Sequence, residues 1–128
     1  VHAGLSAAPI FVPIVGPFYK GLAVTAYLHP GQFARKVSPA DVQKILADYY
    51  AGETFVRVLP FDLEASTEGG SFNVEANNDS NRVDLFVFGN EERMLIVGRL
   101  DNLGKGASGA AVQSMNIHLG IDETKGLD

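Results

Sequence analysis

Cysteine is absent from this chain of 128 residues. That absence excludes disulfide bonds, thiolate metal sites and a cysteine nucleophile within the chain, and it is compatible with a reducing cytoplasm. Long apolar runs are missing too. Because a membrane-spanning helix needs about 18 or more consecutive apolar residues, the sequence predicts no segment that crosses a bilayer.

Basic residues are too few and too scattered to form a nucleic-acid surface. Lys and Arg number 10 against 15 Asp and Glu, which gives a formal net charge of −5. Binding to nucleic acid or to an anionic membrane depends on grouped positive charges that neutralise phosphates. We therefore expect neither nucleic acid nor a membrane among the partners.

The length fits one domain or a piece of a larger one. Hydrophobic residues make up 46% of the composition, and a chain of this length buries roughly two-thirds of its unfolded surface, which is enough to fold alone. Val1 to Leu5 lack the basic start and long apolar stretch of a signal peptide. We interpret Val1 as an engineered start, a processed start or a cut inside a longer chain.

Alternating apolar residues predict most of the sheet. Strands are expected over residues 21–29, 55–59, 83–88 and 93–100. In the first of these, Leu22 and Val24 share one side with Ala26 and Leu28, so at least one face should be buried. Gly89 to Glu92 has the chemistry of a hairpin turn, which makes the last two strands antiparallel. Residues 8–15 contain two prolines and predict an edge strand or irregular chain.

Two helices are expected. Ser38-Pro39-Ala40-Asp41 has the cap, proline and acidic residue of a helix start, and Gly52 is a plausible stop. A second helix should run from about Ala107 to Leu119. Residues 60–81 read as a long functional or mobile loop with one short strand near 72–74. The predicted fold class is α+β: a mostly antiparallel sheet with two helices on one face.

A glycine-rich segment separates the last strand from the second helix. Gly104, Gly106 and Gly109 match G-x-G-x-x-G literally. A dinucleotide fingerprint, however, requires a tight turn after a parallel strand and an acidic residue about 20 positions on, after a second strand. Here the preceding strand belongs to a hairpin and residues 101–103 intervene. A phosphate-binding P-loop is also excluded, because Lys105 is followed by glycine.

Two other interpretations of the segment remain open and are compatible. The glycines can let a small-residue helix pack closely, since Ala107, Ala110, Ala111 and Ser114 line one side of it. A second apolar side, with Val112, Met115 and Leu119, predicts a helix sandwiched between layers. Alternatively, free N–H groups at the helix start, with Lys105 nearby, attract an anion or a carboxamide.

The same segment resembles a known family. Asp101 to Asn116, followed by Leu119-Gly120 and by Glu123 to Leu127, is similar to the C-terminal signature of N-acetyl-gamma-glutamyl-phosphate reductase. This arginine-biosynthesis enzyme is related to aspartate-semialdehyde dehydrogenase. Val12 to Leu22 resembles that family's strand ending in a basic residue and a glycine, and Leu85 to Asn90 resembles its hairpin. The resemblance covers nearly the whole chain.

The resemblance implies that residues 1–128 are a single domain, part of the C-terminal catalytic and dimerisation domain found in glyceraldehyde-3-phosphate and aspartate-semialdehyde dehydrogenases. The family is a cytoplasmic homo-oligomer that reduces N-acetyl-glutamyl 5-phosphate to the 5-semialdehyde. A cysteine thiolate attacks the acyl phosphate, phosphate leaves, and hydride from NADPH reduces the thioester. The cofactor NADP is bound mainly by an N-terminal Rossmann domain, which is not in this chain.

The family's cysteine and its acid–base histidine also precede the matched segments. The neighbours of His2 do not fit the histidine motif, so no catalytic residue is assigned and the isolated chain is expected to be inactive. The resemblance implies Asn102, Lys105 and Gly106 as cofactor contacts and Lys20 as a contact to the substrate phosphate. Structural alternatives stay open: Asp101 and Asn102 can hydrogen-bond their own turn, and Lys20 can be a solvated surface lysine.

No metal site is predicted, because His29 and His118 lack ligand spacing to any partner. Two further hypotheses compete with the reductase domain. The chain can be an oligomerisation or interaction module without chemistry, which the missing cysteine favours. Alternatively, the glycine segment binds NADPH or phosphate unaided.

Overall fold

The centre of the molecule is a four-stranded sheet with the order β1-β4-β3-β2, seen in a computed structural model that describes residues 8–128. Its strands are β1 (Leu22–Leu28), β2 (Val56–Val58), β3 (Val83–Gly89) and β4 (Met94–Leu100). β4 pairs antiparallel with β1 and β3, whereas β2 pairs parallel with β3. The predicted α+β class and the β3–β4 hairpin are therefore confirmed, in a mixed sheet.

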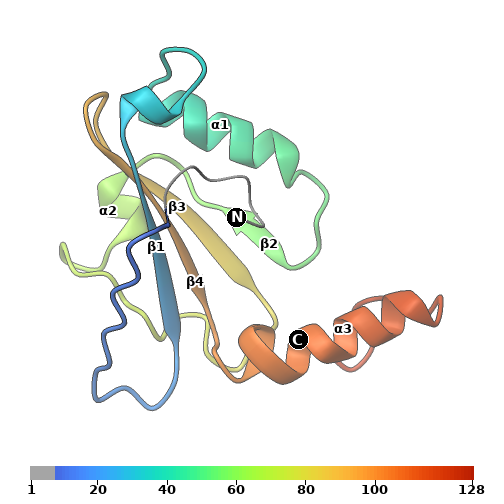
Figure 1. Ribbon diagram of the computed structural model, residues 1–128. Coiled ribbons are helices and arrows are strands. Elements are labelled where there is room, and N and C mark those ends of the chain that lie inside the picture. The colour runs from blue at the N-terminus through green and yellow to red at the C-terminus, as the bar shows by residue number, and fades with distance from the viewer. Residues whose placement is uncertain (1–7) are drawn as a thin grey trace.

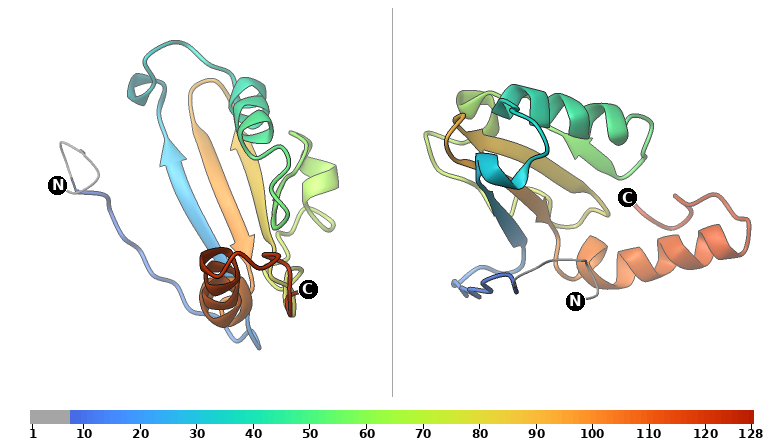
Figure 2. Two further views of the ribbon diagram at one scale, coloured as in Figure 1. Left: turned by 90° about the vertical axis from the view of Figure 1, so that its right-hand side faces the viewer. Right: turned by 45° about the horizontal axis from the view of Figure 1, so that its top comes forward.

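One helix covers the sheet. α1 (Pro39–Tyr49) lies across one face, over the half that carries β3 and β2 (Figures 1 and 2). Its start is fixed as predicted, because the Ser38 hydroxyl accepts from the backbone N–H of Asp41 while the Asp41 carboxylate accepts from that of Ser38. Beneath the helix, buried Val42 packs with Val87 and Met94.

The opposite face is polar and aromatic. Asp84 and Arg99 are partners in the β3–β4 register, and both side chains are buried beneath residues 60–82. The Asp84 carboxylate also receives two hydrogen bonds from Arg57. Burial alone would raise the pKa of Asp84, but the two guanidinium groups outweigh it and hold the pKa below its usual range. Phe86 stacks edge-on against Phe72 from the covering segment.

Several expectations about that covering segment and the arm before β1 are corrected. Residues 60–81 contain a short helix, α2 (Leu63–Ser66), and no strand forms near residue 72; a bridge joins Glu68 and Ser71 instead. Turns closed by side chains replace a ladder here, because Asn and Asp satisfy the backbone locally. Residues 8–15 are irregular, consistent with one of the two alternatives for that run.

The first strand has no buried face. The predicted burial of its apolar side is wrong: Val24 is 55% exposed and Tyr27, on the other side, is 74% exposed. The reason is position, since β1 is an edge strand bonded only to β4, and α1 lies over the other half of the sheet (Figure 2), so that only Leu28 at the end of β1 packs against the core. Two apolar faces are thus open at this edge among the residues that the structure describes.

The second helix was predicted in the right place but with the wrong surroundings. A π-helical turn, η2 (Gly104–Ser108), leads into α3 (Gly109–His118). Gly120, at φ 67°, closes the helix: its N–H donates to Ile117 and the next N–H to Asn116. α3 extends from the end of β4 away from the sheet (Figure 1). It does not share a face with α1, and no second layer within residues 8–128 sandwiches it.

Candidate functional site

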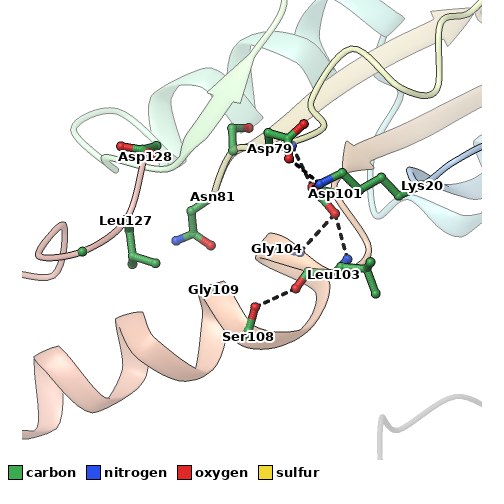
Figure 3. A pocket seen from close by; sticks show the side chains of 12 residues that line it. Lys20, Asp79, Asn81, Asp101, Leu103, Gly104, Ser108, Gly109, Leu127 and Asp128 are labelled. Atoms are coloured by element: carbon green, nitrogen blue, oxygen red, sulfur yellow. Dashed lines mark hydrogen bonds and ion pairs between the residues drawn. The ribbon is translucent and has the colours of Figure 1, made fainter.

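A cavity of about 310 Å³ lies where β4 passes into η2 (Figure 3). Its walls come from three distant parts of the chain: Lys20, which lies two residues before β1; the loop before β3; and the segment from the end of β4 to the start of α3. The lining side chains from these parts are Lys20, Asp79, Ser80, Asn81, Asp101, Leu103 and Ser108. The C-terminal residues Gly126 to Asp128 close the remaining side.

Asp101 is the centre of this arrangement. Its side chain is 1% exposed, and its Oδ1 atom accepts from the backbone N–H groups of Leu103 at 2.8 Å and Gly104 at 3.1 Å. The other oxygen accepts from the N–H of Asp79. Burial alone would raise the pKa of this carboxyl, but Lys20 and the three N–H groups hold it far below its usual range. The carboxylate therefore already occupies the anion position at the helix start.

Lys20 lies between two carboxylates. Its Nζ atom is 2.6 Å from Oδ1 of Asp79 and 2.9 Å from Oδ2 of Asp101, and its side chain is only 11% exposed. Hydrogen bonds to Asp79 and then to Asp101 raise the pKa of the Lys20 ammonium. Lys20 is thus a paired lysine rather than a solvated one. The Asp79 side chain is 83% exposed, and its backbone is left-handed at φ 62°.

Asn102 is bound to the chain just after Lys20. Its Oδ1 atom accepts from the backbone N–H of Gly21 at 2.7 Å. Gly21 is required at this corner, since its φ is +123° and a Cβ atom there would lie 2.7 Å from the Val74 carbonyl oxygen. The structural alternative therefore holds for Asp101, which accepts from the N–H groups of its own turn, whereas the Asn102 side chain binds the distant Gly21. It joins the end of β4 to the beginning of β1.

Lys105 and Gly106, the other predicted cofactor contacts, do not line the cavity. The Lys105 ammonium donates to Oε1 of Gln113 and lies 5.4 Å from the centre of the Phe55 ring. Burial lowers the pKa of Lys105. Gly106 lies against the end of β4, where a Cβ atom would be 3.1 Å from a methyl group of Leu100. Of the four predicted site residues, only Lys20 faces the cavity directly.

Close packing is found at the glycines but not along the small-residue side of the helix, where Ala107, Ala111 and Ser114 are exposed. A Cβ atom on Gly104 would lie 2.9 Å from the carbonyl oxygen of Ser80, and one on Gly109 would collide with the Asn81 side chain. The loop before β3 therefore rests directly on η2 and the first residue of α3. The literal dinucleotide spacing is a coincidence, because the strand before it is antiparallel to both neighbours.

Sequence reasoning missed Asp79 and Asn81. Asn81 is 2% exposed, and its Oδ1 atom has no hydrogen-bond partner among the described residues. The signal was the concentration of Asn, Asp and Ser in residues 77–81, which indicated a loop but not which strand end it would meet. Within residues 8–128, no group of three potential ligand side chains is arranged for a metal ion. His2 lies outside the described residues.

Comparison with known proteins gives a consistent result. Residues 1–102 match the model of a family described as "Semialdehyde dehydrogenase, dimerisation domain". The chain is 45% identical over 129 residues to N-acetyl-gamma-glutamyl-phosphate reductase 2 of a Nostoc species, covering 98% of this chain and 40% of the relative. Reductases of that name from Trichormus variabilis and Brucella ovis are 43% and 42% identical over 98% and 94% of this chain.

The chain therefore spans about two-fifths of the length of the curated relatives it matches, with printed shares of 40%, 40% and 39%. A search of the described helices also found none long and apolar enough to cross a membrane.

Proposed function

Because this chain belongs to the family of semialdehyde dehydrogenase dimerisation domains, we propose that it is the C-terminal dimerisation and substrate domain of an NADPH-dependent reductase. The parent enzyme converts N-acetyl-glutamyl 5-phosphate to the 5-semialdehyde in arginine biosynthesis, in the cytoplasm. The observation that carries this proposal is the similarity to reductases of that name over 94–98% of the chain.

Residues 1–128 are one part of that enzyme's C-terminal domain. The nucleophilic thiolate comes from elsewhere in the parent protein, since this chain has no cysteine. The chain contributes structure around the reacting groups and a surface for a second subunit. By itself it does not catalyse the reduction.

Asn102 is the residue we propose for the cofactor. Its Oδ1 atom is occupied by the Gly21 N–H, which leaves the hydrogens on its Nδ2 atom as the donors for a ligand. An amide donor fits the carbonyl oxygen of a nicotinamide carboxamide. Lys105 and Gly106 shape the backbone of the same loop. When bound, NADPH supplies the hydride, and the part of this chain is to orient the ring.

Lys20 as a contact to the substrate phosphate stays a prediction. Lys20 lines the cavity, and a phosphate reaching its ammonium would have to displace the exposed Asp79 carboxylate. One ammonium and two carboxylates leave a net charge of −1 around Lys20. That negative charge disfavours binding of an anion. Lys20 can therefore contact the substrate phosphate only if Asp79 moves away from it.

The open edge of the sheet supports the second part of the proposal, self-association. The dimerisation-domain match covers the arm before β1 and all four strands. In the arm, Ile10, Phe11 and Val15 are at least 85% exposed, and β1 adds Val24 and Tyr27. Exposed apolar residues gathered along one edge mark an interaction site, and we propose a homo-oligomer built on this edge.

The alternative is an oligomerisation module without chemistry. The absence of a thiol in this chain favours this alternative. One experiment distinguishes it from the reductase hypothesis. The full-length protein encoded with this chain is assayed for oxidation of NADPH in the presence of N-acetyl-glutamyl phosphate. Turnover supports the reductase. A full-length protein that is folded, oligomeric and unable to oxidise NADPH with this substrate refutes it and leaves the oligomerisation module.

A further inference from the structure

Two noncovalent contacts join the chain just before β1 to the chain just after β4. Lys20 binds Asp101 through its side chain, and Gly21 binds Asn102 through its backbone N–H. Leu22 and Leu100 are partners in the β1–β4 register. That register would place Gly21 opposite Asp101 and Lys20 opposite Asn102, so each of these two bonds joins residues one position out of register, just past the last rung of the ladder.

A third segment fastens the same corner. The Nδ2 atom of Asn78 donates to the carbonyl oxygen of Lys20 at 3.1 Å. The N–H of Asp79 donates to the Asp101 carboxylate at 2.8 Å. Three stretches that are far apart in sequence meet on one buried carboxylate. Removing the Lys20 charge would leave Asp101 without its ion pair, while the groups around it were placed for a negative charge.

The electrostatic arrangement points to an internal role for Lys20. Two oxygens already bind its ammonium, and the side chain is almost fully covered. A lysine that serves a phosphate as a point charge needs an unpaired ammonium facing the ligand. Lys20 has its ammonium turned toward the carboxylates of Asp79 and Asp101 (Figure 3).

We propose that Lys20 is a positioning residue that acts through Asp101. Together they hold the corner so that the Gly21 N–H reaches Oδ1 of Asn102 and the Nδ2 hydrogens of Asn102 face outward. The inference rests on the proposed function only in assigning Asn102 to the cofactor. The geometry itself is independent of any reaction.

The first experiment tests that geometry without any activity. Hydrogen exchange at the Gly21 amide is followed in the full-length protein and in Lys20→Met. Because the amide is held by Asn102, exchange should quicken about tenfold when the corner loosens. Lys44→Met removes an exposed helix lysine paired with Asp48 and should leave Gly21 unchanged. Equal protection of Gly21 in the wild type and in Lys20→Met overturns the proposal.

The second experiment separates positioning from phosphate binding. Lys20→Met should raise the KM for NADPH about tenfold, while inhibition by inorganic phosphate changes less than about twofold. Lys20→Arg keeps the charge and should recover most of the loss. A phosphate inhibition constant that rises several-fold, with the KM for NADPH unchanged, overturns the positioning role and favours the substrate role.

The route through Asn102 is tested by combining substitutions. If Lys20 acts by orienting Asn102, Lys20→Met should add nothing to the NADPH defect of Asn102→Ala. Effects that multiply, or an Asn102→Ala enzyme with a normal KM for NADPH, overturn the proposal.

If Lys20→Met does not fold, Lys20→Met/Asp101→Asn removes the unpaired buried charge and serves in its place. A wild-type enzyme that binds NADPH but does not reduce the acyl phosphate refutes the proposed function alone. The affinity for NADPH can then still be compared between the wild type, the two single variants and the double variant by titration.

Discussion

Asp84 on β3 and Arg99 on β4 face each other across the ladder, with Nη2 of the arginine 2.9 Å from Oδ2 of a fully buried carboxylate. The Arg99 guanidinium also donates to Oδ1 of Asn77 and to the carbonyl oxygen of Asn73. One buried ion pair thus attaches the long segment before β3 to the sheet. That segment carries Asp79 and Asn81 to the cavity.

Asp84→Asn should destabilise the protein strongly. The substitution leaves the buried Arg99 guanidinium, together with the half-exposed Arg57, facing a neutral amide, and breaking a buried ion pair costs about 3–5 kcal/mol. Urea unfolding followed by circular dichroism measures the free energy of unfolding. Asp48→Asn, which breaks an exposed pair within α1, is the matched control and should leave stability nearly unchanged. Similar small losses for both variants would contradict a structural role for Asp84.

Stability should fall in acid in a way that depends on Asp101. Its pKa in the folded protein lies below the unfolded value of about 3.9. The resulting stabilisation is complete above the unfolded pKa and is lost as the pH falls through the folded pKa. Urea midpoints measured from pH 6 to pH 2 should therefore drop below about pH 4. Asp101→Asn should flatten that drop, and an unchanged profile would count against the depressed pKa.

Gly109→Ala should weaken the start of α3. The added methyl group collides with the Asn81 side chain and lies 2.9 Å from the Gly104 carbonyl oxygen. Overpacking of this kind costs about 1–3 kcal/mol, although alanine otherwise favours helices. Gly31→Ala is the control, since no atom lies within 4 Å of its Cβ position. Thermal unfolding should show a lower Tm for Gly109→Ala only.

Charges placed on the open edge should disrupt self-association. Val24 and Tyr27 point to opposite faces of β1 and both are exposed, so Val24→Glu and Tyr27→Glu test the two faces separately. Ile45→Glu, on the half-exposed surface of α1, is the control. Sedimentation velocity of the full-length protein should show a smaller species for at least one β1 variant. Unchanged sedimentation of both would exclude this edge as the interface.

The 128-residue chain alone should bind neither NADPH nor phosphate measurably. The helix start is already occupied by the Asp101 carboxylate, and the proposed function assigns most of the cofactor contacts to another part of the parent enzyme. Isothermal titration with each ligand should give no heat of binding. A saturable heat that disappears in Lys105→Ala would instead establish the hypothesis that the glycine segment binds a ligand unaided.

Local chemistry made much of the fold predictable. Ser38, Pro39 and Asp41 set the start of α1 through bonds within four residues of one another. Alternation of apolar residues located β3 and β4, and the Gly89-Asn90 turn paired them. In each case the interacting residues lie close together in sequence, so the local sequence pattern was enough to predict the element.

The candidate site was only partly accessible to such reasoning. The glycine segment was found because a π-turn packed against a loop needs residues without a Cβ atom, and glycine is visible in a sequence. The residues that pack against these glycines could not be found in this way. Ser80 and Asn81 come close to Gly104 and Gly109 only because the β3–β4 hairpin between them brings the chain back. Burial of β1 was misjudged since alternation reports which residues share a side, not whether another element covers it.

The sequence by itself determined the four strands of the sheet, the start of α1, the approximate extent of α3 and the family, but it did not reveal α2. It also determined that no thiol chemistry resides in this chain. Only the tertiary structure decided which way the polar side chains of the corner point. Lys20 faces Asp101 and not solvent, and Asn102 gives its oxygen to Gly21. These choices depend on electrostatic pairing between segments about 80 residues apart, and no local pattern encodes them.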